Sequence, residues 1–466
     1  MVLQLQLNGK SVEISNIDPH TTLLSYLRQT GLTGSKEGCA EGECGACAVL
    51  LLRPDEDSSC LESINGCLLP LASLEGQEVW TVEGLVQNGK LQAAQEAMLQ
   101  GGSQCGYCTP GFIVSMTAEY YRKDRKGFDI EALSGNLCRC TGYRPIKDAA
   151  DSLGKPTSED AFVQRLKQPA PLVKSSSYSY ASQAFYRPIE LPELLDLLSK
   201  YPTAKLIAGG TDWVVEINQR FSRNATQIGI DQIPELKKIK VTNDFIELGA
   251  GLTLSELEHQ LQNKIPLLQE WFPLFASKLI RNRATLGGNI ATASPIGDSP
   301  PVLLALDARL LLVSLKGERE IPLGDFFKGY RKTDLRAGEV IKSIRIPLPL
   351  APLARFYKVS KRRMDDISTV ATGFALELSP ENLASYNIVK SIKIGLGGVA
   401  ATPVRAYKTE ENLLGKPWAL ETIQAAKEII RSEFTPIDDF RGSAAYRVAM
   451  LENLLEKFFI ETQGGL

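Results

Sequence analysis

The feature that most constrains this chain is the spacing of its cysteines. Cys39, Cys44 and Cys47 lie within the ten residues GCAEGECGAC, and no cysteine follows Cys140 in a chain of 466 residues. A secreted disulfide protein usually spreads its cysteines along the chain, whereas cysteines clustered at one end more often bind metal. Only two histidines are present, which disfavours Cys2His2 zinc sites, His-ligated haem and Rieske centres.

The first cysteine group has the Cys-x4-Cys-x2-Cys spacing of plant-type 2Fe-2S ferredoxins, in which a fourth cysteine follows at a distance. Cys67, in the stretch SINGCLLP, is the expected fourth ligand beside Cys39, Cys44 and Cys47. Glycines between them allow backbone N–H groups to turn towards the sulfur atoms of a negatively charged cluster. A zinc knuckle is the alternative, although the four-residue gap is unlike the usual CxxC pairs. Cys60, in the polar stretch DEDSSC, is interpreted as a loop thiol outside the cluster.

Two further pairs, Cys105 with Cys108 and Cys138 with Cys140, provide four thiolates, enough for one more metal centre. The first pair precedes Pro110, which suits the first turn of a helix, and the second pair lies in a glycine-bounded loop at another helix end. The free N–H groups and the dipole of a helix start favour an anionic cluster. Taken alone, this group is equally compatible with zinc; beside a ferredoxin-type motif we favour a second 2Fe-2S cluster.

The overall composition argues against several classes of function. The formal net charge of −2 leaves no basic field to neutralise the phosphates of nucleic acids or the surface of a membrane. No run of roughly 18 or more apolar residues predicts a membrane span. The first residues, MVLQLQLNGKSVEIS, alternate like a strand and do not resemble a signal peptide, so we expect a cytoplasmic protein.

The pattern of the sequence changes along the chain, whose length suits about three domains. The N-terminal alternation breaks at an Asn-Gly pair, a strong hairpin signal, and TTLLSYLRQTG predicts a helix capped by Thr21 or Thr22 and closed by Gly31. LQAAQEAMLQGG and GFIVSMTAEYYRKD then show helical spacing of apolar residues. A stretch rich in Pro, Ser and Lys predicts a linker. The cysteine-free α/β region beyond it ends on the predicted helix AAYRVAMLENLLEKFFIET.

Three glycine-rich segments in the cysteine-free region are candidates for nucleotide binding. GLGGVA, at 395–400, fits a dinucleotide fingerprint, but ATPVRA follows where a Rossmann turn must open into a helix. LIAGGTDW, at 206–213, and TLGGNIATASPIGD, at 285–298, each bring paired glycines and hydroxyls to a predicted strand end. Backbone N–H groups in such loops can face a pyrophosphate. Either segment alone is compatible with tight turns in a structural domain.

Taken together, GCAEGECGACAV, SINGCLLP, QCGYCTPGF and GNLCRCTGYRPI resemble the two iron–sulfur modules of the molybdenum hydroxylases, the family of xanthine dehydrogenase and aldehyde oxidase. The resemblance covers about the first third of the chain and all eight paired cysteines. The segments at 206–213 and 285–298 resemble the flavin-binding domain of the same family, in which FAD lies across both segments.

The resemblance implies a multi-domain α+β chain. A β-grasp 2Fe-2S ferredoxin-like domain (1–82) is followed by an all-α helical 2Fe-2S domain (83–155) and a linker (156–180). An α+β FAD-binding domain of the vanillyl-alcohol-oxidase/PCMH type (181–347) then precedes a C-terminal α+β flavoprotein sub-domain (348–466).

Carried over by position, the resemblance also implies a set of FAD contacts. They are Leu206, Ile207, Ala208, Gly209, Gly210, Thr211, Asp212 and Trp213 from the first segment, Thr285, Leu286, Gly287, Gly288 and Asn289 from the second, and the separate residues Phe275, Asp298, Ile341 and Lys358. The charged stretch KRRMDDIS, at 361–368, resembles the loop where family dehydrogenases admit NAD+, which implies a role for Arg363, Asp365 and Asp366. The usual animal pattern has Glu where this chain has Met364, and a solvated ion-pair loop is the alternative.

The family's third component, a large molybdopterin domain, has no counterpart in this sequence. The resemblance therefore implies the electron-transfer subunit of a split xanthine dehydrogenase, with a molybdopterin-binding large subunit as partner and no catalytic residue for the hydroxylation in this chain. Electrons would pass from molybdopterin through two 2Fe-2S clusters to FAD and on to NAD+, as hypoxanthine or xanthine is oxidised to urate. By analogy the assembly is a heterotetramer, a dimer of heterodimers. The alternatives are another molybdenum hydroxylase, acting on aldehydes or N-heterocycles, and a non-enzymatic electron carrier or zinc scaffold.

Overall fold

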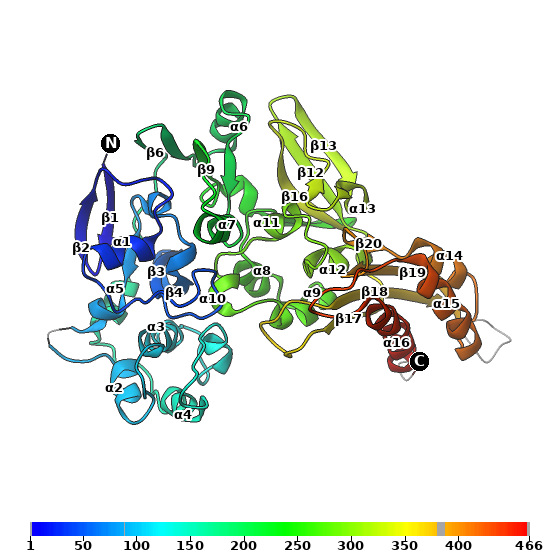
Figure 1. Cartoon of the computed structure of the whole chain (residues 1–466), viewed down its shortest axis with the longest axis horizontal. Coiled ribbons are helices and arrows are strands. Elements are labelled where there is room, and N and C mark those ends of the chain that lie inside the picture. The colour runs from blue at the N-terminus through cyan, green and yellow to red at the C-terminus, as the bar shows by residue number, and fades with distance from the viewer. Residues whose placement is uncertain (1, 88, 380–386, 464–466) are drawn as a thin grey trace. The chain divides into compact units, whose positions relative to one another are not determined.

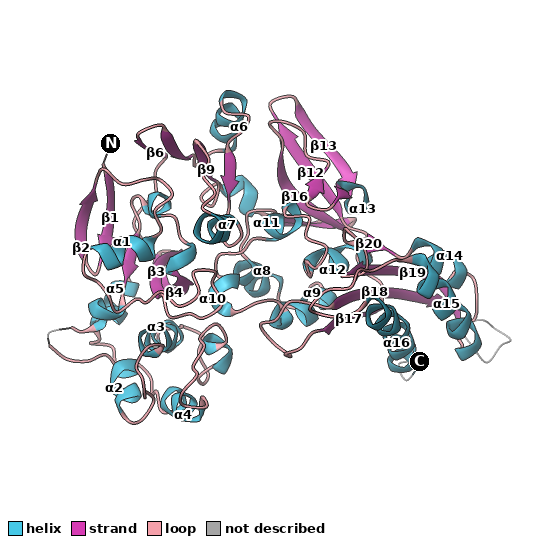
Figure 2. Ribbon diagram, in the orientation of Figure 1, coloured by secondary structure: helices cyan, strands magenta, loops and turns pink. Residues whose placement is uncertain are grey.

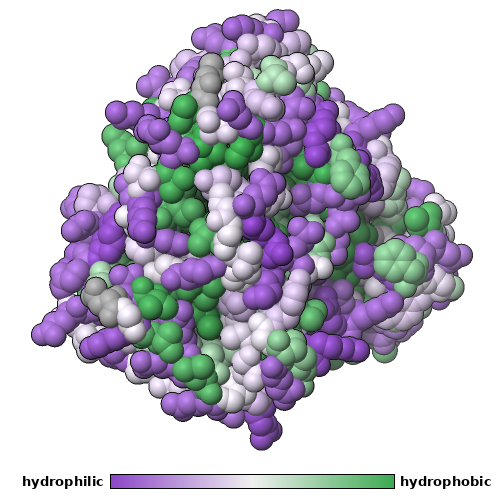
Figure 3. Space-filling view, turned by 60° about the vertical axis from the view of Figure 1, so that its left-hand side comes forward, coloured by the Kyte–Doolittle hydropathy of each residue, from purple (hydrophilic) through white to green (hydrophobic). Residues whose placement is uncertain are grey.

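The computed structural model describes residues 2–87, 89–379 and 387–463, and the chain divides into two compact units (Figures 1 and 2). The first unit comprises Met1–Ile233 and Ser277–Ala284, and the second comprises Pro234–Ala276 and Thr285–Leu466. Among the described residues, no helix combines the length and the apolar composition that a membrane span requires. On the face drawn in Figure 3, hydrophilic side chains predominate and apolar ones are scattered among them.

The first unit begins with a five-stranded sheet of order β2-β1-β5-β3-β4. β1 and β2 form the predicted hairpin around Asn8 and Gly9, and β1 also pairs in parallel with β5. Alternate leucines of β1 pack against the buried face of α1, whose N-cap is Thr22. The elements are β1 (Leu3–Leu7), β2 (Lys10–Ile14), α1 (Leu23–Gln29), β3 (Ala48–Asp55), β4 (Ser58–Asn65) and β5 (Glu78–Trp80).

Four helices follow and share one apolar core with this sheet. Phe112 and Val114 of α3 pack in the same cluster as Leu50 and Leu52 of β3. The stretch predicted as a linker, 156–180, contains a helix and a strand, α5 and β6, and two buried apolar side chains of α5, Phe162 and Leu166, join that core. The helices are α2 (Ala93–Leu99), α3 (Thr109–Tyr120), α4 (Arg144–Asp151) and α5 (Ala161–Leu166).

The remainder of the first unit is built on a four-stranded sheet of order β6-β7-β9-β8. Its central pairs, β7 with β9 and β9 with β8, are parallel, so the chain crosses over between them through α6 and α7. The elements are β6 (Ser176–Tyr180), β7 (Gln183–Arg187), α6 (Leu191–Lys200), β8 (Lys205–Ile207), α7 (Trp213–Arg220), β9 (Thr226–Gly229) and α10 (Lys278–Arg281).

The second unit contains two larger antiparallel sheets, of order β10-β11-β16-β12-β13 and β17-β18-β19-β20. The strands are β10 (Ile239–Val241), β11 (Phe245–Gly249), β12 (Arg309–Ser314), β13 (Gly317–Pro322), β14 (Phe327–Gly329), β15 (Lys332–Thr333), β16 (Val340–Pro347), β17 (Leu353–Val359), β18 (Val370–Ser379), β19 (Ile388–Gly397) and β20 (Val404–Arg405). The helices are α8 (Leu254–Leu261), α9 (Pro266–Trp271), α11 (Leu286–Ala291), α12 (Ser299–Ala305), α13 (Leu323–Phe326), α14 (Tyr407–Leu413), α15 (Leu420–Glu433) and α16 (Ala444–Gln463).

Helices α15 and α16 pack with the β17–β20 sheet around a common apolar core (Figure 1). The ring of Phe458 on α16 stacks on that of Phe374 on β18, with centroids 4.8 Å apart. The predicted C-terminal helix is therefore confirmed. The GLGGVA stretch ends β19 and leads into a loop, and the next helix begins only at Tyr407, so it is not a Rossmann turn. The α+β class predicted from the sequence is the class that the structure shows.

Candidate cofactor sites

The first cysteine group lies in the loop between α1 and β3, and Cys67 follows β4 in a 3-10 turn, Gly66–Leu68. Side-chain hydrogen bonds join the thiols in two neighbouring pairs, Cys39 with Cys44 and Cys47 with Cys67. Across the described ranges, no three His, Cys or acidic side chains are spaced to hold a single metal ion. A 2Fe-2S cluster shares four thiolates between two irons, and two neighbouring pairs of thiols fit that requirement.

Backbone N–H groups of the same loop point at the thiols. Those of Glu41, Glu43 and Cys44 donate hydrogen bonds to the sulfur of Cys39. The pKa of the Cys39 thiol is lowered to about 5, chiefly by the hydrogen bond from the Cys44 side chain and further by these N–H groups, although burial opposes the shift. A loop that stabilises negative charge on sulfur in this way suits an anionic cluster.

Two glycines show why this loop needs residues without side chains. A Cβ atom at position 38 would lie 2.7 Å from the sulfur of Cys44. Gly45 has a φ of +64°, and a Cβ atom there would lie 2.3 Å from the carbonyl oxygen of Gly135. Both distances are shorter than any real Cβ contact. The loop can therefore surround the thiols and pack on residue 135 only because positions 38 and 45 are glycine.

The second cysteine group lies at the starts of two helices. Cys108 is the N-cap residue of α3, and Cys138 and Cys140 precede α4. The thiols again form two pairs, Cys105 with Cys140 and Cys108 with Cys138. Cys105 and Cys140 are exposed, whereas Cys138 is buried. This group therefore also suits a 2Fe-2S cluster, with one pair of thiols at the surface.

Thr141 supplies hydrogen bonds to the second group. Its hydroxyl oxygen lies 3.1 Å from the sulfur of Cys138, and its backbone N–H donates to the same sulfur at 3.4 Å. Burial alone would raise the pKa of the Cys138 thiol, but the bonds from Thr141 and from the N–H of Cys140 outweigh it and lower the pKa. The surroundings of Cys138 thus favour the thiolate that a cluster needs.

The two cysteine groups adjoin each other within the first unit. The N–H of Leu137, the residue before Cys138, donates to the carbonyl oxygen of Cys44 at 3.0 Å. The side-chain amide of Asn136 reaches the carbonyl oxygen of Gly45 at 3.4 Å. The backbone around one set of thiols therefore packs directly on the backbone around the other.

Helix α7 connects the first cysteine group with the first predicted flavin segment, because it begins where that segment ends. The side-chain amide of Asn218 donates to the carbonyl oxygens of Ala40 and Cys67 at 2.9 and 2.8 Å. The neighbouring Gln219 donates to the carbonyl oxygen of Cys39 at 2.9 Å. Sequence reasoning missed both amides, since a polar residue inside a helix usually faces solvent and no local pattern marks one that reaches a distant loop.

The first predicted flavin segment, 206–213, runs from the end of β8 to the start of α7 in the first unit. A Cβ atom at Gly209 would lie 1.9 Å from the carbonyl oxygen of Arg283, and one at Gly210 would lie 2.8 Å from that of Leu68. The paired glycines therefore let this turn run against two other backbones. The indole N–H of Trp213 donates to Gln227 at 3.1 Å, which fixes the start of α7.

The second predicted flavin segment lies in the second unit and starts a helix, so the expectation of a strand end is wrong here. Thr285 is the N-cap of α11, and its hydroxyl accepts a hydrogen bond from the N–H of Gly288 at 3.0 Å. The side-chain oxygen of Asn289 accepts a hydrogen bond from the hydroxyl of Ser299 at 2.5 Å. Thr285 caps the helix and the buried Leu286 follows it, which is a typical helix start. The segment therefore forms a helix although it contains paired glycines.

Two of the separate predicted FAD contacts, Asp298 and Lys358, form a buried ion pair. The ammonium group of Lys358 lies 2.7 Å from a carboxylate oxygen of Asp298, with side-chain exposures of 3% and 6%. The same ammonium donates to the carbonyl oxygen of Leu274 at 2.8 Å, and the hydroxyl of Ser368 donates to Asp298 at 2.5 Å. The sequence named Asp298 and Lys358 only as separate FAD contacts and gave no role to Ser368, whose contact depends on the path of the chain after β17.

The other two separate FAD contacts lie on different elements of the second unit. Phe275 follows Leu274, and its ring centroid lies 5.1 Å from that of Trp271. Ile341 lies on β16 opposite Leu312 and is buried. Phe275 therefore adjoins Leu274, whose carbonyl oxygen accepts a hydrogen bond from Lys358. Ile341 instead belongs to the sheet that contains β12 and β16.

The loop predicted to face NAD+ is held by its own acidic residues. Asp366 accepts hydrogen bonds from the backbone N–H groups of Arg362 and Ile367 at 2.8 and 2.9 Å. Burial would raise the pKa of Asp366, but these two bonds outweigh it and lower the pKa. The side chain of Arg362 also donates to the carbonyl oxygen of Asp365. Among the described residues, Arg363 has no hydrogen-bond or ion-pair partner and is exposed.

Cys60 was expected in a loop, and that expectation is wrong. The turn between β3 and β4 is completed by residue 57, so Cys60 lies on β4, opposite Arg53. Burial raises the pKa of its thiol to about 12, which keeps it protonated at neutral pH.

Four protein-family models match successive parts of the chain. Residues 5–69 match a 2Fe-2S iron-sulfur cluster binding domain, and residues 81–151 match a 2Fe-2S binding domain. Residues 178–349 match the FAD binding domain in molybdopterin dehydrogenase, and residues 355–462 match the CO dehydrogenase flavoprotein C-terminal domain. The cofactors of the chain are therefore two 2Fe-2S clusters and FAD, as the sequence predicted.

Similar proteins are known by sequence and by structure. Xanthine dehydrogenase of Emericella nidulans is 34% identical over 530 residues, covering 98% of this chain and 38% of that protein, so the chain spans about two fifths of it. A solved chain of carbon monoxide dehydrogenase from Hydrogenophaga pseudoflava is 31% identical, with a TM-score of 0.55 over 59% of this chain and 94% of that one. A chain of quinoline 2-oxidoreductase from Pseudomonas putida 86 is 25% identical, with a TM-score of 0.56 over 62% and 99%.

Proposed function

Because the chain belongs to the molybdenum hydroxylase family, we propose that it is the electron-transfer subunit of a molybdenum-dependent xanthine dehydrogenase. In this proposal, electrons released at a molybdopterin on a partner subunit pass through the two 2Fe-2S clusters to FAD and then to NAD+, while hypoxanthine or xanthine is oxidised to urate. Iron–sulfur clusters carry single electrons, and FAD converts single-electron into hydride transfer.

The observation that carries the proposal is the order of the sites in the first unit. The N–H of Leu137 links the second cysteine group to the first at the carbonyl of Cys44. Asn218, at the other side, links the first group to the helix that follows the flavin segment. The first group thus contacts the backbone before Cys138 on one side and α7, which follows the predicted flavin segment, on the other, and this supports a relay in which it stands between the second group and FAD.

The exposure of the second group supports its assignment as the point where electrons enter. Cys105 and Cys140 are exposed, whereas Cys47 and Cys67 of the first group are buried. We infer that a molybdopterin-binding large subunit docks beside the exposed thiols. The residues that carry out the hydroxylation belong, in this proposal, to that subunit, and the assembly is a dimer of heterodimers.

The choice of xanthine and NAD+ is supported by the relatives and by one loop. The similar proteins from Emericella nidulans and Arabidopsis thaliana are named xanthine dehydrogenases. Arg363 lies in the loop predicted to face NAD+. Its guanidinium is exposed and has no ion-pair partner among the described residues, so it offers this loop an unpaired positive charge. The clustered free cysteines support a cytoplasmic site, where thiols stay reduced.

A second candidate is the same role in another molybdenum hydroxylase. The carbon monoxide dehydrogenase and quinoline 2-oxidoreductase chains share 31% and 25% identity with this one, so family membership is compatible with other substrates.

The deciding experiment is co-purification of the chain with its molybdopterin partner, followed by assays of substrate and acceptor. We expect about four iron per chain, two for each cluster, one FAD, and NADH formation that depends on xanthine. NADH formation with an aldehyde or quinoline but not with xanthine would overturn the substrate assignment. Xanthine-dependent consumption of O2 with NAD+ left oxidised would overturn the acceptor. Two zinc ions and no flavin absorbance would overturn the relay itself.

A further inference from the structure

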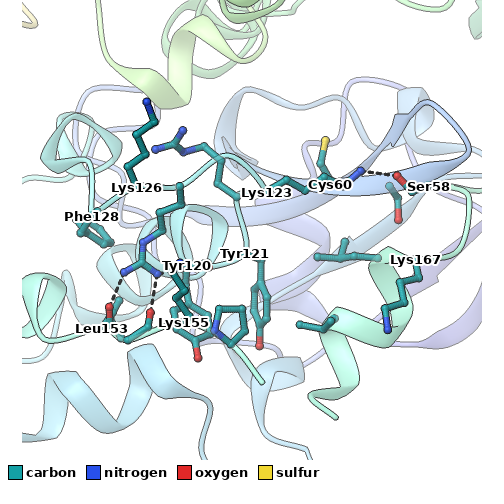
Figure 4. Close-up of a pocket in the computed structure, with 18 of the residues that line it drawn as sticks. Ser58, Cys60, Tyr120, Tyr121, Lys123, Lys126, Phe128, Leu153, Lys155 and Lys167 are labelled. Atoms are coloured by element: carbon teal, nitrogen blue, oxygen red, sulfur yellow. Dashed lines mark hydrogen bonds between the residues drawn. The ribbon is translucent and has the colours of Figure 1, made fainter. Parts of the chain in front are cut away.

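A cavity of about 860 Å³ lies in the first unit, apart from the residues predicted to bind the clusters and FAD (Figure 4). Its walls come from the turn between β3 and β4, the end of α3 with the loop after it, the stretch after α4, and α5. The volume falls in the range of small-molecule binding sites. None of the eight paired cysteines lines it.

The inner wall of the cavity is apolar and aromatic. Tyr120, Tyr121, Leu153 and Leu166 line it and are buried, and Phe128 adds a half-buried ring. The rings of Tyr120 and Tyr121 meet edge to face, with centroids 4.9 Å apart. These side chains present carbon surface that an apolar ligand could cover.

Two polar side chains at this wall, those of Tyr121 and Arg125, already have partners. The hydroxyl of Tyr121 donates to the carboxylate of Asp160 at 2.9 Å. The guanidinium of Arg125 donates to the carbonyl oxygens of Leu153 and Gly154 and lies over the ring of Tyr120. A ligand would therefore find a fixed wall with few unsatisfied polar atoms.

The lysines that line the cavity are of two kinds. Lys123 is held by Asp55 at 2.5 Å and by Ser58 at 2.6 Å. Lys126, Lys155 and Lys167 are exposed, and their ammonium groups have no hydrogen-bond or ion-pair partner in the described part of the chain. In Figure 4, Lys155 and Lys167 are drawn on either side of Tyr121.

The balance of charge around the cavity is positive. Six of its lining residues are basic and three are acidic. Arg122 and Lys123 are paired with acids outside the lining, and Asp151 is paired with Lys147, which leaves four basic and two acidic residues. Such a local excess of positive charge attracts anions even though the whole chain has a net charge of −2.

We propose that this cavity binds a small organic anion with an apolar aromatic or aliphatic body. The body covers the rings of Tyr120, Tyr121 and Phe128, and the anionic group lies between the free ammonium groups of Lys155 and Lys167. Burial of apolar area supplies most of the affinity, and the two ammonium groups select a charged ligand over a neutral one of the same shape.

The test is isothermal titration calorimetry of the full chain, loaded with clusters and FAD, with anilinonaphthalene sulfonate as the probe. We expect one saturable site per chain, with affinity that falls as salt is added. Combined Lys155→Gln and Lys167→Gln substitutions should weaken binding about tenfold or more, since each removes a charge-assisted hydrogen bond. The control is Lys10→Gln, which removes an exposed lysine on β2, also without a partner in the described structure, and should leave binding unchanged.

A second variant, Gly127→Trp, tests the cavity itself. Gly127 lines the cavity, a Cβ atom there would meet nothing within 4 Å, and its backbone is outside the left-handed region, so the fold accepts a side chain. We expect Gly127→Trp to abolish binding while the visible absorbance of the clusters is retained. Absence of saturable binding to the unmodified chain would overturn the proposal. So would unchanged binding to both variants, or equal binding of neutral anilinonaphthalene.

Discussion

The two cysteine groups each place four thiols in two neighbouring pairs, but they are built in different ways. The first is surrounded by a glycine-rich loop of the β-grasp sheet, and two of its thiols, those of Cys47 and Cys67, are buried. The second is placed at the starts of α3 and α4, and the thiols of Cys105 and Cys140 are exposed. Cluster properties depend on hydrogen bonds to sulfur and on exposure, so the two sites are not equivalent.

This difference matches the positions of the two groups in the proposed relay. A site that receives electrons from another protein has to approach the surface, and the second group does so. A site that passes electrons between two neighbours inside one chain has to be fixed relative to both, and the hydrogen bonds from Leu137 and Asn218 fix the first group on two sides.

The largest effect is expected when a ligand of the buried group is removed. Cys67→Ser should remove the first cluster, so that iron falls from about four to about two per chain and NADH formation falls to background. The signal of the second cluster in electron paramagnetic resonance should persist, because its four thiols are intact. Cys60→Ser is the control, since Cys60 lies on β4, the strand before Cys67, and the charged groups around its thiol are Arg53, Asp55, Glu62 and Lys123, with no cysteine among them. Retention of four iron by Cys67→Ser, or loss of iron from Cys60→Ser, would show that the ligand set is wrong.

The contact between the two groups can be broken at Gly45. Gly45→Ala places a Cβ atom 2.3 Å from the carbonyl oxygen of Gly135 and must move the backbone before the second group. We expect a loss of about 2–4 kcal/mol in the free energy of unfolding, from left-handed strain together with overpacking. Gly31→Ala is the control, because Gly31 has a φ of +89° and open space around it. It should cost about 1 kcal/mol, the conformational part alone. Equal losses in denaturant titrations of both variants would mean that the contact contributes nothing.

The cysteine groups were predictable because their spacing alone restricts the chemistry to a few metal centres. Thr22 as a cap and the hairpin at Asn8 were predictable for a similar reason, since both signals are local. The placement of Cys60 on a strand depended on where a hairpin turn closes. The start of α11 at Thr285 was misjudged because paired glycines are also common in turns.

Long-range contacts could not be predicted from the sequence. Asn218 lies 151 residues from Cys67 and 178 residues from Ala40, and only the crossover through α7 brings its amide to both carbonyl oxygens. The family resemblance named Asp298 and Lys358 as separate FAD contacts, but their ion pair, its burial and its further partner Ser368 came from the folded structure. In each case nothing in the neighbouring sequence marks the side chain as unusual, and its contact arises only from the tertiary structure.

Removal of the Asn218 amide should weaken the attachment of the first cysteine group to α7, the helix that follows the first predicted flavin segment. Asn218→Ala leaves the carbonyl oxygens of Ala40 and Cys67 without this donor, which should lower the free energy of unfolding by about 1–3 kcal/mol. It should also slow reduction of FAD by the first cluster in stopped-flow experiments. Gln219→Ala, which loses one bond from an exposed residue, should have a smaller effect. Equal effects of the two variants on FAD reduction would contradict a special role for Asn218.

The smallest effect is expected when one side-chain hydrogen bond to a cysteine sulfur is removed, because the two groups differ in the donors that substitution can reach. The donors to Cys39 identified in its loop include backbone N–H groups, which substitution does not remove, whereas the hydroxyl of Thr141 reaches Cys138 in the second group at 3.1 Å. A ligating cysteine is a thiolate, so the hydroxyl is the donor in that contact.

Thr141→Val therefore removes one donor from the second cluster alone. Hydrogen bonds to sulfur favour the reduced cluster, which carries one more negative charge, so the potential of the second cluster should become more negative. A net hydrogen-bond energy of about 0.5–1.5 kcal/mol corresponds to a shift of about 20–60 mV for one electron. Redox titration followed by electron paramagnetic resonance resolves the two clusters, and the first should not change. Thr141→Ser retains the hydroxyl and should keep the potential of the unmodified chain. If the potential of the serine variant shifts as far as that of the valine variant, the hydroxyl is not the cause. The difference between the two sites then rests on exposure.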